Sequence, residues 1–106
     1  MAQDLTDSTF DDMVAKSELP VLVDFGASWC GPCVQQAPIL EKWEQANTDK
    51  VLVAQVNVDE AQQLASRFGV MSIPTLIVFS GGEEKARVLG LQNERGLDAL
   101  LAKAAS

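Results

Sequence analysis

The sequence predicts an α/β fold, in which helices cover both faces of a mixed β-sheet. Two short runs, 21–25 and 75–79, consist mostly of β-branched and aromatic residues, which is typical of strands buried on both faces. Stretches with helical recurrence of apolar residues separate these strands along the chain. The pair Gly81-Gly82 predicts a tight hairpin, which adds an antiparallel strand. This succession of elements favours a layered α/β domain.

The first predicted helix covers about 8–17, and either Asp7 or Ser8 is placed to cap it. The apolar residues on one face of this helix are Phe10, Met13 and Val14. The run 21–25 then reads as a central strand, and it contains a single charge, Asp24.

A second helix is predicted to begin near Cys30, directly after this strand. Pro38 removes one of its hydrogen bonds, so we expect a kink there. The helix ends at 47–49, and the run 51–58 gives the clearest strand signal in the chain.

The remaining elements are a helix over 61–68, a buried strand over 75–79, an edge strand around 87–89 and a last helix. Gly69 suits the left-handed end of the third helix, and Asn93 suits the cap of the last one. The apolar stripe of that last helix is formed by Leu97, Leu100 and Leu101.

Length and composition indicate one soluble globular domain over residues 1–106. Hydrophobic residues make up 47% and charged residues 22% of the chain. A chain of this length can bury one core without cross-links, so neither cysteine is needed as a structural staple.

The net charge of −7 argues against nucleic-acid binding, because such a chain repels phosphate backbones. No stretch approaches the roughly 20 apolar residues that span a bilayer, so no membrane association is expected. Residues 1–11 have neither a basic segment nor an apolar run, so we expect no secretory signal and a cytoplasmic location. In that reducing compartment a close cysteine pair indicates catalysis or metal binding.

The cysteine pair lies where a buried strand gives way to a helix, as Cys30-Gly31-Pro32-Cys33. Unpaired N–H groups and the helix dipole at such a position stabilise a thiolate, so Cys30 is the predicted nucleophile. Cys33 lies one turn further along and faces inward, so it is the predicted resolving thiol. Gly31 allows close approach of a substrate backbone, and Pro32 fixes φ without removing a needed N–H. Trp29 is expected to shield the pair from one side.

Three other interpretations of the pair stay open. A zinc site needs four ligands, and two cysteines without any histidine could supply them only between two subunits. A structural disulfide across two residues would constrain little chain. Inert thiols with this spacing by coincidence are the third interpretation.

Four segments together carry a resemblance to a known family. They are Val23-Asp24-Phe25, Trp29-Cys30-Gly31-Pro32-Cys33, Ala37-Pro38-Ile39-Leu40 and Ile73-Pro74-Thr75. In this order and spacing they closely resemble the thioredoxin family, and the resemblance extends over nearly the whole chain. It implies the thioredoxin fold, with a central five-stranded mixed sheet flanked by four helices. It also implies a cis peptide before Pro74, with Pro74 against the cysteines and the backbone of Ile73 pairing with substrate.

Asp24 is a carboxylate in an otherwise apolar strand, so it is predicted to lie buried beneath the cysteines with a raised pKa. The resemblance implies that it takes the proton from Cys33 during catalysis. The alternative is a structural aspartate bonded to nearby backbone.

Three residues depart from the family's common pattern. Gln55 stands where thioredoxins commonly place a lysine near this aspartate, so we expect Asp24 to be harder to ionise. Gly26 replaces a frequent tryptophan, which should leave the wall beside the cysteines more open. Val34 replaces a frequent lysine after the second cysteine, which removes a positive charge near the site.

A substrate segment is predicted to dock on an apolar collar around Cys30, made of Trp29, Ile73, Pro74, Leu89 and Gly90. For Leu89, ordinary strand packing is the alternative. Gly90 matches a family glycine that leaves room for the substrate backbone.

The predicted function is reduction of protein disulfides by dithiol–disulfide exchange. No Gly-x-Gly-x-x-Gly motif follows a strand, so no bound cofactor is expected. Electrons would come from a partner protein, which the resemblance implies is a thioredoxin reductase dependent on flavin and NADPH. The expected partners are disulfide-containing proteins and this reductase, and the expected state is a monomer. An oxidase or isomerase, and a non-enzymatic subunit of a larger complex, are the alternative functions.

Overall fold

The computed structural model describes residues 2–105, which form five strands and four helices. In chain order they are β1 (Gln3–Leu5), α1 (Phe10–Lys16), β2 (Val21–Gly26), α2 (Gly31–Ala46), β3 (Leu52–Asn57), α3 (Gln62–Arg67), β4 (Thr75–Ser80), β5 (Glu83–Leu89) and α4 (Glu94–Ala105). The predicted α/β class and thioredoxin fold are confirmed.

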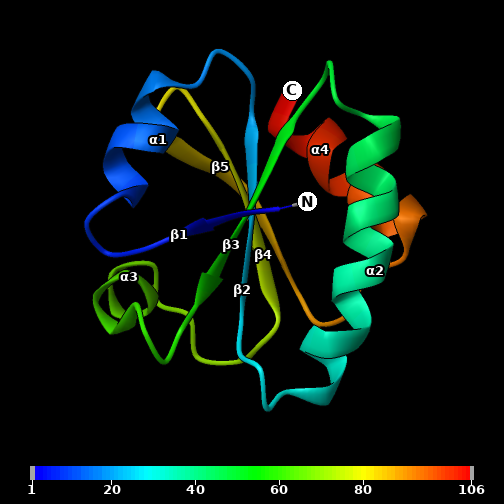
Figure 1. Cartoon of the computed structure of the whole chain (residues 1–106). Coiled ribbons are helices and arrows are strands. Elements are labelled where there is room, and N and C mark those ends of the chain that lie inside the picture. Colours follow the sequence, from blue (N-terminus) through cyan, green and yellow to red (C-terminus); the bar gives the residue numbers. More distant parts are fainter. Residues whose placement is uncertain (1, 106) are drawn as a thin grey trace.

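The five strands form one mixed sheet with the order β1-β3-β2-β4-β5. Both β1 and β2 run parallel to β3, whereas β4 runs antiparallel to β2 and to β5. Helices α1 and α3 cover one face of the sheet, and α2 and α4 cover the other (Figure 1). The central position of β2 explains why its residues are almost all apolar, since helices pack on both of its faces.

Alternate residues of β2 belong to two separate hydrophobic cores. Val21, Val23 and Phe25 pack on the side of α1 and α3, where the rings of Phe10 and Phe79 meet edge to face with centroids 5.2 Å apart. On the other side are Leu22 of β2, Leu40 and Trp43 of α2, and Leu97 and Leu100 of α4. Because side chains alternate along a strand, Asp24 and Gly26 point to the same side as Leu22, toward α2.

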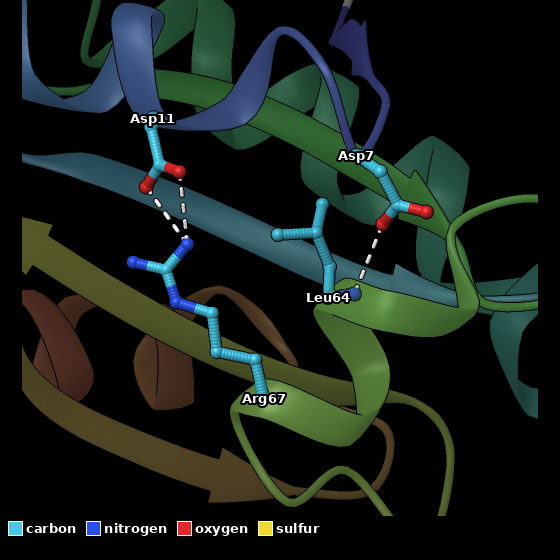
Figure 2. Close-up of polar contacts among 4 residues, drawn as sticks. All are labelled: Asp7, Asp11, Leu64 and Arg67. Atoms are coloured by element: carbon cyan, nitrogen blue, oxygen red, sulfur yellow. Dashed lines mark hydrogen bonds and ion pairs between the residues drawn. The ribbon is translucent and has the colours of Figure 1, made fainter.

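The start of α1 differs from the prediction. The helix begins at Phe10 and its N-cap is Thr9, so the prediction of Asp7 or Ser8 as the cap was wrong. The Oδ1 atom of Asp7 instead accepts the backbone N–H of Leu64 at 3.0 Å, at the first turn of α3 (Figure 2). Two hydrogen bonds of 2.8 and 3.0 Å from Arg67 to Asp11 also join α3 to α1.

The remaining elements follow the sequence closely. Helix α2 continues through Pro38 to Ala46, and β5 starts at Glu83 rather than near Arg87. The hairpin glycines Gly81 and Gly82 have φ of 62° and 82°, which places both in the left-handed region that such a turn requires. The predicted cap of α4 is also present, because Asn93 Oδ1 accepts the N–H of Gly96 at 2.9 Å.

Candidate active site

The two cysteines lie at the junction of β2 and α2 and form a disulfide with Cα atoms 5.2 Å apart. Cys30 is the N-cap of α2, and its Sγ accepts the backbone N–H of Cys33 at 3.2 Å. Pro32 lies in the first turn, where its missing N–H leaves no helical hydrogen bond unmade. A thiolate on Cys30 would therefore meet a directed N–H donor and the positive end of the helix dipole.

The exposed fractions of the two cysteines are similar, so they do not show which of the two sulfurs is the more accessible. Cys30 is 6% exposed and Cys33 is 9% exposed, although the sequence predicted that Cys33 faces inward. The physical reason is Gly26, which has no side chain to cover Cys33. A cavity of about 510 Å³ opens there, and Cys33, Gly26 and Asp24 form part of its wall.

Pro74 follows a cis peptide bond, as the resemblance implied. The carbonyl oxygen of Ile73 lies 3.8 Å from Cys30 Sγ, so this loop packs against the first cysteine. The N–H of Gly90 donates to the carbonyl of Pro74 at 2.7 Å. Gly90 has φ of 90°, a conformation that a residue with a Cβ rarely adopts. The structure thus brings Ile73, Pro74 and Gly90 together beside Cys30.

Trp29 and Leu89 are largely exposed, at 70% and 58%. The partly buried side chains packed against the cysteines are Val58 and Ile73, and shielding of the pair by the exposed Trp29 stays a prediction. The indole N–H of Trp29 donates to Asp59 at 2.7 Å, and this bond orients the ring toward the segment after β3. Its apolar face remains available at the surface, as the predicted collar requires.

Sequence reasoning missed two neighbours of this collar. Asp59, which lies between β3 and α3, positions Trp29 although the two residues are 30 apart in the sequence, and no local spacing predicts such a contact. Met71 precedes the Ile73-Pro74 segment and is 97% exposed, which is unusual for an apolar side chain. Val34, named above for its lost charge, is 59% exposed in the first turns of α2.

Asp24 is 7% exposed, and its Oδ1 atom has no hydrogen-bond partner among the described residues. Burial raises the pKa of this carboxyl group from 3.8 to about 6. An ideal Cβ on Gly26 would lie 3.1 Å from Cys33 Sγ and 3.8 Å from Asp24 Oδ1, so both groups border the same point. The missing partner argues against the interpretation of Asp24 as a fully bonded structural aspartate.

Gln55 lies directly opposite Asp24 in the register of β2 and β3, and both residues line the cavity. Its amide donates to Asp4 at 2.5 Å. Within residues 2–105, no lysine or arginine side chain belongs to the cavity wall, so none there offsets the desolvation of Asp24.

Replacing Gln55 with lysine is expected to lower the pKa of Asp24 below its value of about 6, because an opposite charge nearby favours the carboxylate. NMR titration of the Asp24 side-chain carbon in the disulfide-bonded protein measures this value. Gln35→Lys, on the exposed face of α2, adds the same charge outside the cavity and serves as the matched control. An Asp24 pKa that is equal in both variants contradicts the prediction.

No group of three or more His, Cys, Asp or Glu side chains within residues 2–105 is arranged to hold a metal ion. No helix in the same range is long and apolar enough to cross a membrane.

Comparison with known proteins assigns the family. The family model described as thioredoxin matches residues 1–103. The chain is 50% identical over 98 residues to thioredoxin of Alicyclobacillus acidocaldarius, with 92% of each chain covered. It is 45% identical over 102 residues to thioredoxin 1 of Nostoc sp., with 96% of this chain and 95% of that protein covered. It is 44% identical over 97 residues to thioredoxin of Rickettsia felis, with 92% of each chain covered. Together with the fold and the disulfide at the start of α2, these matches show that the chain belongs to the thioredoxin family of thiol–disulfide oxidoreductases.

Proposed function

We propose that this oxidoreductase reduces disulfides in partner proteins, with Cys30 as the attacking thiol and Cys33 as the resolving thiol. The observation that carries the proposal is the N–H of Cys33 directed at Cys30 Sγ at the N-cap of α2. Only the cysteine at that position gains both the hydrogen bond and the helix dipole as a thiolate.

The reaction has two exchange steps. The Cys30 thiolate attacks one sulfur of the substrate disulfide, which forms a mixed disulfide and releases the other substrate sulfur as a thiolate. Asp24 accepts the proton of Cys33, and the resulting thiolate attacks Cys30 Sγ. The reduced substrate leaves, and the Cys30–Cys33 disulfide remains. A carboxyl with a pKa of about 6 is ionised often enough near neutrality to serve as this base.

Substrate docking involves the collar beside Cys30. An extended segment of the partner lies along Ile73 and Pro74, and its apolar side chains contact Trp29 and Leu89. Exposed apolar surface of this kind is typical of protein-binding sites. Gly31 and Gly90 carry no side chains, so the partner backbone can approach the sulfur from both sides.

The oxidised pair is returned to the dithiol by a thioredoxin reductase, which supplies electrons from outside the chain. The protein acts as a monomer in the cytoplasm, without membrane or nucleic-acid partners. The acidic surface, with a net charge of −7, favours encounters with basic partner surfaces.

Reduction of insulin tests the proposal. We expect the protein to accelerate insulin precipitation in the presence of dithiothreitol, and Asp49→Asn, in the exposed turn after α2, to behave like the parent chain. No acceleration would favour a non-enzymatic binding subunit. A disulfide that forms at equilibrium only in strongly oxidising glutathione buffers would favour an oxidase.

A further inference from the structure

The cavity beside Gly26 borders the Cys33 side of the disulfide, where the proposed function places no substrate. Cys30 faces the Ile73 carbonyl, at the collar, and is not part of the cavity wall. Cys33 is part of that wall. The collar thus lies beside Cys30, whereas the cavity borders Cys33.

Gly26 is the reason that Cys33 borders open space. The position that its side chain would occupy lies 3.1 Å from Cys33 Sγ and 3.8 Å from Asp24 Oδ1. A side chain at position 26 would therefore crowd Cys33, and its absence leaves both the sulfur and the carboxylate bordering the cavity. Asp24 Oδ1 lacks a hydrogen-bond partner in the part of the chain that the structure describes, so an incoming donor would satisfy it.

The cavity wall carries charge of one sign. Asp4, Asp24 and Glu60 contribute carboxyl groups, and no lysine or arginine among the described residues belongs to the wall. Coulombic attraction in such a site favours cationic molecules over anionic ones of the same size. The volume of about 510 Å³ suits a small molecule and excludes a folded protein.

We propose that this cavity binds small cationic thiols and disulfides, which exchange directly with Cys33 instead of Cys30. The proposal rests on the proposed function only in that Cys30 and Cys33 form the exchanging pair. Protein substrates would use the collar, and small cationic thiols would use the cavity.

The exchange begins when the incoming thiol gives its proton to the Asp24 carboxylate. Its thiolate attacks Cys33 Sγ, a new sulfur–sulfur bond forms, and the bond between Cys30 and Cys33 breaks. Cys30 leaves as a thiolate that accepts the N–H of Cys33, and a stabilised thiolate is the better leaving group. A second thiol molecule attacks the small-molecule sulfur of this adduct. Two thiols are oxidised to one disulfide, and the protein gains two electrons and two protons.

Reagents of opposite charge test access to Cys33. Aminoethyl and sulfonatoethyl methanethiosulfonate carry the same reactive group with a positive and a negative charge. In a Cys30→Ser background we expect the cationic reagent to modify Cys33 about tenfold faster, because the carboxylates attract one reagent and repel the other. This ratio should fall toward one in about 1 M salt, where charges are screened within a few ångströms. Mass spectrometry of quenched samples gives both rates.

Two variants close the cavity by different routes. Gly26→Trp fills it from the sheet, and Ala37→Phe covers it from the exposed face of α2. We expect either variant to slow modification of Cys33 about tenfold or more, because access limits exchange at a buried sulfur. Ala102→Phe, on the exposed face of α4, is the matched control and should leave the rate unchanged.

Equal rates for the two reagents, or rates that neither cavity variant changes, would overturn the proposal. A single turnover of insulin by the reduced Ala37→Phe protein separates this result from failure of the proposed function. That turnover occurs at the collar and should be unaffected when the cavity is closed. If the parent chain also shows no single turnover of insulin, the proposed function has failed, independently of the rates measured with the two methanethiosulfonate reagents.

Discussion

Replacing Cys30 with serine is expected to abolish insulin reduction, whereas replacing Cys33 with serine should arrest the reaction at a mixed disulfide. A serine hydroxyl cannot form or exchange a disulfide, so neither variant completes a cycle. The difference arises because Cys30 alone receives the N–H of Cys33 at the N-cap of α2. The Cys33→Ser protein should therefore still attack a substrate and remain bound to it.

Non-reducing electrophoresis and mass spectrometry of each variant, after incubation with insulin, measure the trapped species. Covalent complexes should accumulate with Cys33→Ser and disappear when dithiothreitol is added. The double variant, which lacks both sulfurs, is the control for non-covalent association. Complexes that accumulate with Cys30→Ser instead would reverse the assigned roles of the two cysteines.

Replacing Asp24 with asparagine is expected to stabilise the oxidised protein above pH 6. The pKa of Asp24 is about 6 in the folded protein and 3.8 as its ordinary value, so the folded chain holds the proton more tightly. Stability is therefore greatest when the group is protonated in both states, and it is lost as the pH rises from about 4 to about 6. The loss amounts to about 3 kcal/mol. The amide of the introduced asparagine is also buried without a partner, which costs part of this free energy. The variant is therefore expected to be more stable than the parent chain by about 1–3 kcal/mol.

Urea unfolding of the disulfide-bonded protein at several pH values measures this effect. The free energy of unfolding of the parent chain should fall across this range, and the Asp24→Asn chain should show a flatter dependence. Asp49→Asn removes a carboxylate from an exposed position and is the matched control. A variant that is less stable than the parent chain at pH 8 would mean that the charged form of Asp24 is stabilised by a partner.

The fold and most of the site could be predicted from the sequence because their signals are local. The β-branched runs in β2 and β4 predicted strands buried on both faces, and both strands lie in the interior of the sheet. Asp24 was conspicuous as the single charge in such a run, and its burial follows from the strand. The Cys-x-x-Cys spacing fixes two residues one helical turn apart, wherever the helix lies.

The features that could not be predicted depend on segments distant in the sequence. Asp7 has the residue type and position of a helix cap, but its carboxylate bonds to Leu64 in α3. Trp29 was predicted to lie beside the cysteines, but no local pattern predicts the bond from its indole N–H to Asp59. Gly26 predicted an open wall, but the size and acidic lining of the cavity depend on how β1, β2, β3 and α2 pack together.

The bonds from Asp7 to Leu64 and from Arg67 to Asp11 have a consequence for local unfolding (Figure 2). Helix α3 spans only Gln62–Arg67, has no side-chain cap of its own, and depends on the segment around α1 at both of its ends. Such short helices open readily unless other elements hold them. In native-state hydrogen exchange, the amide of Leu64 should therefore open together with the amides of α1, as one cooperative unit formed by segments more than fifty residues apart.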